Sequence, residues 1–535
     1  MMRTTWRNAV RAGFAGGAII ALLLGGGAAL AAPGGNSGGK PGGNAGGSGW
    51  PVAGGDRENT RYAASEKKIS ATNVDGLSVR WVFTTEGNVS ATPAVDATQV
   101  YVPDAAGNLF AVDRATGQQV WSAKISSYTG VPGDTAIATP AVTDTALVFG
   151  NQGPFGGGGG EVLAVDKATG ELLWSTEVED HPTAMITQAA TVFDGVVYVG
   201  TDSIEPYYAG VLPNYPCCSF RGSLVALDLA TGAILWKTYM ADVGYPGAAV
   251  WGSSPAIDAK RKSVYIATGS NSDLPDDVLS CVQAAGEDAN AQRACIPADD
   301  LFDSIVALDL RTGAIKWVTR TLPFDAWNFA CIPGLGDGVN CPEPHGPGHD
   351  FGQAPMLFTA KSGRDKGVET LGVGQESGQF WALDPATGAI RWITQAGPDG
   401  TFGGMEWGSA TDGSQVYTAN ANSNRIPYLE STDGVWSALD ARTGQIRWQT
   451  RPTYGGSTAG PVTTANGVVF GCALDQLGHM YALNAATGEV VWAFESGGSC
   501  ISGAAISNGT VYWGSGYDYL GLGMPNAKLY AFGLD

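Results

Sequence analysis

The stretch that decides the fold is AVDRATGQQVW at residues 111–121, in which Asp113, Thr116-Gly117 and Trp121 stand at fixed distances. The same order of residues returns six more times. The further copies are Asp166/Gly170/Trp174, Asp228/Gly232/Trp236, Asp309/Gly313/Trp317, Asp384/Gly388/Trp392, Asp440/Gly444/Trp448 and, with Asn in place of Asp, Asn484/Gly488/Trp492. Chance does not produce seven copies, so the chain is a repeat protein.

Each copy is typical of a strand, a turn and a second strand. An alternating apolar strand ends at Asp113, whose side chain can accept backbone N–H bonds in a turn where Gly117 takes a positive φ. A second strand follows and ends on Trp121, whose indole can pack between neighbouring sheets. The repeat therefore predicts an all-β protein of many short strands.

The two ends of the chain supply an eighth unit. Leu529-Tyr530-Ala531-Phe532 restarts the apolar strand, and residues 77–81 form a lone strand that ends in Trp81. Pairing the N-terminal strand with the C-terminal strands in one blade closes a ring and leaves no open edge. We therefore expect an eight-bladed β-propeller; the alternative is a seven-bladed ring with a stray tail.

Extra length marks where function is expected. The spacing between copies is greatest before the third, fourth and fifth, and long insertions on a rigid scaffold usually carry binding or chemistry. Six of the eight cysteines lie in these insertions: Cys217, Cys218, Cys281, Cys295, Cys331 and Cys341.

The N-terminus is typical of an export signal. Three arginines precede a short apolar run at residues 18–24, and Ala29-Leu30-Ala31 offers small residues at the cleavage spacing. We expect a signal peptide at 1–31, a Gly-rich linker at 32–49 and the propeller at 50–535. The mature chain is then periplasmic or secreted and has no membrane span; the alternative is an uncleaved anchor.

Composition narrows the partners. Asp and Glu number 50 against 30 Lys and Arg, which gives a net charge of −20. This charge disfavours nucleic acid and favours a basic protein partner. An even number of cysteines in an exported chain predicts disulfides, and the absence of C-x-x-C-H means that the chain carries no covalent c-type haem.

Three segments carry a resemblance to a known family. They are YPCCSFRG at 215–222, DAWNFAC at 325–331 and WGSGY at 513–517. With the repeat, they resemble the quinoprotein alcohol dehydrogenases, and the insertions look most like the polyvinyl-alcohol dehydrogenase branch. The likeness runs from about Gly54 to the last residue. The repeat alone also occurs in scaffold propellers of bacterial outer-membrane assembly.

The resemblance implies a site for pyrroloquinoline quinone. In the family, adjacent cysteines form a disulfide ring against one face of the quinone, a position that Cys217-Cys218 matches. Trp251 matches the tryptophan that stacks on the other face. Thr187 and Arg221 resemble residues that bind the cofactor's carboxylates and carbonyls, since an Arg fork suits such oxygens. The alternatives are separate cysteine partners or free thiols, a core Trp251 and a surface ion pair for Arg221.

The resemblance also implies a metal ion and a base. Glu205 resembles the glutamate that binds Ca²⁺ (or a lanthanide), and Asn271 stands beside the family's metal-binding Asn position. Asp325 is the candidate base that removes the substrate's hydroxyl proton, and it is also a candidate metal ligand. Asp303 is the reserve base. The alternatives are a solvated carboxylate at Glu205 and a turn-forming Asp325.

Four positions depart from the family pattern. Ser270 replaces the metal-binding Asn, and Asn328 stands where the base of methanol-type enzymes follows the Trp. Asp202 replaces a serine that contacts the quinone. Glu376 replaces a Lys or Arg that faces the quinone's carbonyls, so a carboxylate there would repel the anionic cofactor unless it is protonated or bridged by a metal.

The sequence thus predicts a dehydrogenase that oxidises an alcohol, a secondary one or a hydroxyl-bearing polymer, and passes electrons to a separate soluble cytochrome c. Two other interpretations are a non-catalytic binding scaffold and a degenerate quinoprotein that has lost its cofactor. Of the 105 possible cysteine pairings, we predict one set: Cys217–Cys218, Cys281–Cys295, Cys331–Cys341 and Cys472–Cys500.

Overall fold

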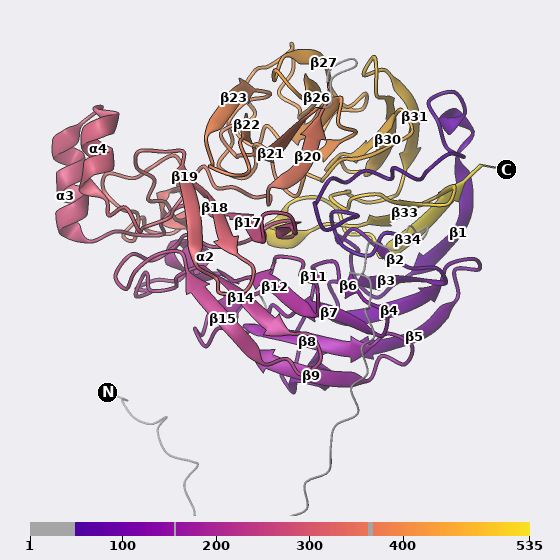
Figure 1. Ribbon diagram of the computed structural model, residues 1–535, viewed down its shortest axis with the longest axis horizontal. Helices are drawn as coiled ribbons and strands as arrows, with labels where there is room; N and C mark the ends of the chain where they lie inside the picture. The colour runs from indigo at the N-terminus through magenta and orange to yellow at the C-terminus, as the bar shows by residue number, and fades with distance from the viewer. Residues whose placement is uncertain (1–48, 155–156, 362–366, 535) are drawn as a thin grey trace, which may run out of the picture. The chain divides into compact units, whose positions relative to one another are not determined.

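The computed structural model describes residues 49–154, 157–361 and 367–534. Within them, eight four-stranded sheets stand around a central axis, each with its first strand nearest the axis and its fourth at the rim (Figure 1). The predicted eight-bladed propeller is therefore confirmed. The expected signal peptide and almost all of the expected linker lie outside the described residues.

Four blades lie between Ala94 and Arg320. They contain β2 (Ala94–Val95), β3 (Gln99–Pro103), β4 (Asn108–Asp113) and β5 (Gln119–Lys124); β6 (Ala141–Val142), β7 (Ala146–Gly150), β8 (Glu161–Asp166) and β9 (Leu172–Glu177); β11 (Thr191–Phe193), β12 (Val196–Gly200), β14 (Ser223–Asp228) and β15 (Ile234–Tyr239); and β16 (Ala256–Asp258), β17 (Ser263–Ala267), β18 (Ser304–Asp309) and β19 (Ile315–Arg320).

The remaining blades follow the same order. They contain β20 (Met356–Ala360), β21 (Val368–Gly374), β22 (Gln379–Leu383) and β23 (Ile390–Gln395); β24 (Ala410–Thr411), β25 (Gln415–Asn420), β26 (Val435–Asp440) and β27 (Ile446–Thr450); β28 (Thr463–Ala465), β29 (Val468–Cys472), β30 (His479–Asn484) and β31 (Val490–Glu495); and β32 (Ala505–Ser507), β33 (Thr510–Ser515), β34 (Lys528–Gly533) and β1 (Ser78–Thr84).

The last of these sheets closes the ring. β1 runs antiparallel to β34, from Ser78 opposite Gly533 to Thr84 opposite Lys528. Trp492 of the preceding blade donates from Nε1 to the carbonyl of Leu77 at 3.1 Å. The N-terminal strand is thus the outer strand of the C-terminal blade, and the seven-bladed alternative is wrong.

The repeat motif works locally as predicted. Asp113 Oδ1 accepts the backbone N–H of Thr116 at 2.8 Å, and Gly117 has a φ of 72°. A Cβ at Gly117 would lie 2.6 Å from the indole of Trp81 in the neighbouring blade, so only glycine lets the ring pack there. Six further pairs repeat this contact: Gly170 and Trp121, Gly232 and Trp174, Gly313 and Trp236, Gly388 and Trp317, Gly444 and Trp392, and Gly488 and Trp448.

One detail of the predicted repeat is wrong. Trp121 is the third residue of β5 and does not end it, because the strand goes on to pair with β4, where Lys124 lies opposite Asn108. Residues of β5 thus pair with β4 both before and after Trp121 in the chain. Its Nε1 donates to the carbonyl of Lys167 in the next blade at 3.0 Å.

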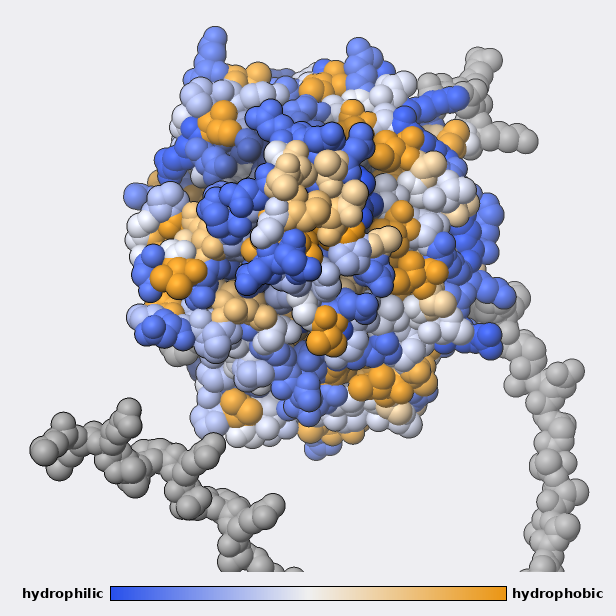
Figure 2. All heavy atoms as spheres, turned by 90° about the vertical axis from the view of Figure 1, so that its left-hand side faces the viewer, coloured by the Kyte–Doolittle hydropathy of each residue, from blue (hydrophilic) through white to orange (hydrophobic). Residues whose placement is uncertain are grey.

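Helices and one small sheet occur only in connections. They are α1 (Ile125–Thr129), α2 (Glu205–Val211), α3 (Asp276–Ala285), α4 (Ala289–Cys295), the 3₁₀ turns η1 (Val74–Gly76), η3 (Phe329–Cys331) and η4 (Tyr519–Gly521), and the pair β10 (Ala184–Met185) with β13 (Asp202–Ser203). The α3–α4 hairpin projects at the left of Figure 1. In Figure 2, which faces this side, hydrophilic and hydrophobic side chains are interspersed. Among the described residues, no helix has both the length and the hydropathy to cross a membrane.

All four predicted disulfides are present. They join Cys217 to Cys218, Cys281 to Cys295, Cys331 to Cys341 and Cys472 to Cys500. The second ties α3 to α4, the third closes the loop that follows η3, and the fourth joins β29 to the loop before β32. The insertions are therefore fixed covalently.

Candidate active site

A cavity of about 340 Å³ lies where loops from the blades converge. Its wall includes four carboxylates, from Asp202, Asp350, Glu376 and Glu406, and a single cationic side chain, Arg61. These residues come from segments far apart in sequence. The cavity is thus a product of ring closure, and no single motif builds it.

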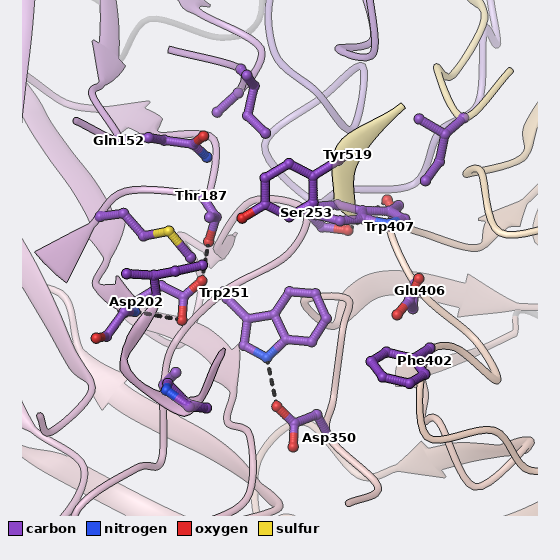
Figure 3. Close-up of a pocket in the computed structure, with 18 of the residues that line it drawn as sticks. Gln152, Thr187, Asp202, Trp251, Ser253, Asp350, Phe402, Glu406, Trp407 and Tyr519 are labelled. Atoms are coloured by element: carbon purple, nitrogen blue, oxygen red, sulfur yellow. Dashed lines mark hydrogen bonds between the residues drawn. The ribbon is translucent and has the colours of Figure 1, made fainter. Parts of the chain in front are cut away.

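Asp350 connects the carboxylates to an aromatic ring. Trp251 donates from Nε1 to Asp350 Oδ2 at 2.9 Å (Figure 3), and the backbone N–H of Ser270 donates to Oδ1 at 2.8 Å. The backbone N–H of Asp350 donates to Glu376 Oε2 at 2.9 Å. The predicted residues Trp251 and Glu376 therefore meet at Asp350, which the sequence analysis did not single out.

Glu376 and Glu406 form a carboxyl pair. They share a side-chain hydrogen bond, which requires a proton on one of them. Burial, followed by the charges of Asp350 and Glu406, raises the pKa of Glu376 well above its ordinary value. Burial raises the pKa of Glu406 to about 7. Near neutral pH the pair thus retains a proton, which lowers its repulsion of an anionic ligand.

Asp202 lies on β13 at another part of the cavity wall. Thr187 donates from Oγ1 to Asp202 Oδ2 at 2.8 Å, and the backbone N–H of Ser203 donates to Oδ1 at 2.7 Å (Figure 3). Burial raises the pKa of Asp202 to about 7. The structure thus brings the predicted Thr187 to the cavity, where it orients a carboxylate.

The predicted bases form a buried pair that does not line the cavity. The backbone N–H groups of Gly348 and His349 donate to Asp325 Oδ1 at 3.0 Å and Oδ2 at 2.8 Å. Neither oxygen of Asp303 receives an N–H or O–H from the described residues, and its one hydrogen-bonding neighbour is the carboxyl of Asp325. Burial raises the pKa of Asp325 to about 7 and that of Asp303 well above its ordinary value.

Asn271 and Asp300 extend this group. Asn271 Nδ2 donates to Asp300 Oδ1 at 3.2 Å, and the backbone N–H of Asn271 donates to the carbonyl of Asp325 at 3.2 Å. Asn271 Oδ1 and Asp300 Oδ2 are buried and lack a hydrogen-bond donor within the described chain. Asp300 was not foreseen; a signal was available in its position three residues before Asp303, just ahead of β18.

Glu205 also lies outside the cavity lining. The Glu205 carboxylate is occupied by the backbone N–H groups of Ser219, at 2.9 Å, and Phe220, at 2.8 Å. Glu205 therefore anchors the segment that follows the Cys217–Cys218 disulfide. Both N–H groups donate to Oε2, so Oε1 can still reach a cation and the metal-ligand hypothesis for Glu205 stays a prediction.

Arg221 and the Cys217–Cys218 pair belong to the same segment. The Arg221 guanidinium donates to the carbonyl of Ala241 at 2.9 Å and stacks on Tyr239, 4.1 Å from the ring centroid. Only Phe220 of this segment lines the cavity. The expected quinone-binding arginine and disulfide are therefore not among the residues that line the cavity.

Aromatic side chains line the cavity beside the carboxylates. Phe329 lies 5.3 Å from both Phe402 and Tyr207 and 5.3 Å from Trp327, measured between ring centroids. Phe402 is 40% exposed and Tyr519, on η4, is 41% exposed. We call Tyr207, Trp327, Phe329, Phe402 and Tyr519 the aromatic rim. It gives the cavity an apolar, partly exposed border.

Comparison with known proteins identifies the family. The PQQ_2 family model, described as outer membrane protein assembly factor BamB, matches residues 4–203, 65–319 and 376–534. The chain belongs to this family. A polyvinylalcohol dehydrogenase from Sphingopyxis sp. (strain 113P3) is 29% identical over 512 residues, which cover 88% of this chain and 72% of that protein. A polyvinylalcohol dehydrogenase from Pseudomonas sp is 28% identical over 519 residues, with 88% and 73% covered.

Solved structures agree on the fold of this PQQ_2 protein. The quinohemoprotein alcohol dehydrogenase from Comamonas testosteroni superposes with a TM-score of 0.68 at 19% identity, covering 91% of this chain and 80% of that one. The expected relationship to quinoprotein alcohol dehydrogenases, with polyvinylalcohol dehydrogenases among the relatives, is confirmed.

The residues of this PQQ_2 propeller fit an anionic quinone. Arg61 and Gln152 line the cavity, and each has a buried side-chain N–H that no described residue accepts: Arg61 Nε and Nη1 and Gln152 Nε2. Folding normally leaves few buried polar groups unpaired. Trp251 and Trp407, with ring centroids 5.6 Å apart, provide aromatic surface for a flat ring.

The buried oxygens fit a metal ion. Acceptors without donors, on Asn271, Asp300 and Asp303, are the amide and carboxylate oxygens that Ca²⁺ prefers. Among the described residues, the one cluster of His, Cys, Asp or Glu side chains with three ligand atoms within 4.8 Å of one another is Cys331, Cys341 and His345, which is not a metal site because its two cysteines are bonded to each other.

Proposed function

We propose that this protein is a periplasmic quinoprotein dehydrogenase that oxidises an alcohol with pyrroloquinoline quinone and a metal ion, Ca²⁺ or a lanthanide. The proposal rests on two sets of buried groups that lack partners. One set is N–H donors in the cavity wall, and the other is the oxygens of Asn271, Asp300 and Asp303. Donors suit the cofactor's carboxylates and oxygens suit the cation. The four disulfides support an oxidising compartment.

The chain's own residues supply binding and proton transfer. When bound, the quinone supplies the oxidising power and the metal supplies Lewis acidity. Trp251 would hold one face of the ring. Asn271, Asp300 and Asp303 would hold the cation, and the Asp303–Asp325 pair, which lies next to the cavity lining through the bond from Gly348 N–H to Asp325 Oδ1, would accept the hydroxyl proton. A base works best with a pKa near the working pH, and burial places that of Asp325 at about 7.

The aromatic rim supports a bulky or polymeric alcohol as substrate. An extended carbon chain can pack on Phe402 and Tyr519 while one hydroxyl enters toward the carboxylates. Two relatives named polyvinylalcohol dehydrogenase point in the same direction. We therefore propose a secondary alcohol or a hydroxyl-bearing polymer as the substrate class.

The composition of the chain supports a separate electron acceptor. The chain has no C-x-x-C-H motif, and its net charge is −20. We propose a soluble, basic cytochrome c, which an acidic surface attracts. Electron transfer to it should slow as salt rises, over a Debye length of about 8 Å at physiological ionic strength. If the rate of electron transfer to a neutral dye depended equally on salt, the electrostatic attraction to a basic cytochrome would be contradicted.

The departures from the family pattern have local explanations that favour a functional site over a degenerate one. Asn328 caps η3: it accepts the N–H of Ala330 at 2.8 Å and donates to the carbonyls of Ser272 and Asn340. Glu376 shares a proton with Glu406 and so presents less charge to the cavity. A pure scaffold has no need for unpaired buried donors.

Reconstitution tests the proposal. Purified protein, stripped with chelator, is given quinone and Ca²⁺ separately and together, and oxidation of a secondary alcohol and of a polyvinyl alcohol is followed with a neutral dye. We expect turnover only with both additions. Failure to bind the quinone would favour the degenerate interpretation or the scaffold, and full occupancy by the quinone without oxidation of any alcohol would overturn the proposed activity.

A further inference from the structure

Arg61 is a buried guanidinium without a carboxylate partner. It is 2% exposed, and among the described residues only the carbonyl of Trp407 accepts from it, at 2.9 Å from Nη2. Its Nε and Nη1 reach no acceptor although four carboxylates line the same cavity. A buried charge of this kind is costly unless a ligand pairs with it.

The chain builds a place for this side chain. The Arg61 backbone has a φ of 49°, a left-handed conformation that is rare outside glycine, and is held by hydrogen bonds to Gly54 and Thr464. A Cβ at Gly408 would overlap Arg61 Nε, and one at Gly503 would lie 3.2 Å from Nη1. Two glycines and an unusual backbone thus keep the guanidinium at the cavity wall.

The charge of Arg61 persists at neutral pH. Burial lowers the pKa of Arg61 to about 9, which still leaves the guanidinium protonated at pH 7. Among the described residues it is the one cationic side chain in the cavity lining, where Gln152 Nε2 adds a neutral N–H donor without an acceptor. An alcohol substrate is neutral and cannot balance this charge. An anion with several oxygens can.

We propose that Arg61 binds a carboxylate of the quinone cofactor and fixes which end of the cofactor enters first. This inference rests on the proposed function and assigns to Arg61 the role that the family resemblance assigned to Arg221, whose guanidinium is already occupied by Ala241 and Tyr239. With a cofactor carboxylate at Arg61, the free N–H of Gln152 offers a further donor in the same cavity wall.

Equilibrium binding of quinone, measured without turnover, tests the assignment. Chelator-stripped protein with added Ca²⁺ is titrated with pyrroloquinoline quinone, and binding is read by tryptophan fluorescence and by calorimetry. We expect Arg61→Gln to raise Kd at least about thirty-fold, the scale for losing one partner of a buried charge pair. Arg61→Lys keeps the charge but lacks the planar guanidinium, so its Kd should lie between those of the unmodified protein and of Arg61→Gln.

Stability separates a binding role from a structural one. If Arg61 is there for a ligand, Arg61→Gln removes an unpaired buried charge, and the ligand-free variant should unfold at the same or a higher temperature than the unmodified protein. A lower melting temperature of the ligand-free variant together with unchanged quinone affinity would make Arg61 structural and overturn the inference.

Two further variants complete the design. Arg447→Gln is the matched control, since Arg447 pairs with Asp440 on an outer strand away from the cavity; it should leave Kd unchanged. Weaker binding in Arg221→Gln with normal binding in Arg61→Gln would restore the family assignment and overturn ours. Absence of quinone binding in the unmodified protein would overturn the proposed function, and with it the ligand assigned to Arg61.

Discussion

The aspartates of the repeat turns and the buried carboxylates beside the cavity are chemically alike, but they differ in hydrogen bonding and in the direction of their pKa shifts. In the turns, Asp228 Oδ1 accepts the side-chain O–H and the backbone N–H of Thr231, at 2.7 and 2.9 Å, and these bonds lower its pKa. At the centre, Asp303 receives no N–H or O–H from a described residue, and burial raises its pKa well above the ordinary value.

The difference teaches which carboxylates fold the chain and which serve a ligand. A turn aspartate is satisfied by its own repeat and needs nothing further. The central group is satisfied only if a cation or a proton arrives, because burial removes water as a partner. Unsatisfied polar groups are therefore the most direct structural evidence for function in this molecule.

The largest effect is expected from Asp303→Asn. It removes a proposed cation ligand and one member of the proton-accepting pair, so alcohol oxidation should fall at least about a hundred-fold. The fold should survive, because the side-chain oxygens of Asp303 accept no backbone N–H from the described residues. Dye-linked kinetics and the Ca²⁺ dissociation constant measure the effect, with circular dichroism as the check on folding. A variant that keeps full activity at limiting Ca²⁺ would show that Asp303 is outside the site.

Glu376→Lys should have an intermediate effect of the opposite sign. The ammonium would pair with Glu406 and Asp350, which now repel Glu376, and would face the cofactor as the family's Lys or Arg does. Quinone binding should tighten about ten-fold, as for one new charge contact in a buried site. Unchanged Kd would mean that Glu376 does not face the cofactor. Loss of Ca²⁺ binding would instead make Glu376 a metal ligand.

The pH dependence of stability sharpens the comparison further. Burial raises the pKa of Asp202 and Glu406 to about 7. For an acid whose folded pKa is raised, the stability it contributes is full below the ordinary pKa, near 4, and is lost as pH rises toward 7. The melting temperature of the ligand-free protein should therefore fall between pH 4.5 and 8. Asp202→Asn should flatten the curve, and an unaltered slope in that variant would contradict a raised pKa.

The sequence alone predicted almost the whole fold but only part of the site. The turn chemistry of Asp113 and Gly117 is local, so seven copies of the motif were enough to predict the blades, and the lone strand ending in Trp81 was enough to predict closure. The exception was the position of Trp within its strand, since strand ends depend on pairing across the sheet.

The site was harder because loops decide it. Trp251, Thr187 and Glu376 were found at the cavity, but Arg221 contacts Ala241 and Tyr239, and Glu205 holds Ser219 and Phe220. Spacing cannot tell which side chain of a loop points toward the axis. The residues to which sequence reasoning gave no role lie in connections far apart in the chain and carry no common motif: Arg61, Gln152, Asp300, Asp350, Glu406 and Trp407.

The smallest effect is expected from Asp228→Asn, the counterpart of Asp303→Asn. The seventh repeat already has Asn484 at this position, where Oδ1 accepts the backbone N–H groups of Ala486 and Thr487 at 2.9 and 3.3 Å. The change should alter the free energy of unfolding by less than about 0.5 kcal/mol and leave activity intact. Urea denaturation measures it. A loss as large as that of Asp303→Asn would erase the distinction between the two regions.

The central claim is that the unsatisfied groups of the cavity wall and of the buried carboxylates beside it form one site for a quinone and a cation. Thermal unfolding of the chelator-stripped protein, with quinone, Ca²⁺ or both added at pH 8, tests it most directly, because a ligand that binds only the folded state raises the melting temperature. The account predicts a small rise with either ligand alone and a much larger rise with both. Melting temperatures that stay the same in all four conditions, at ligand concentrations up to millimolar, would contradict it.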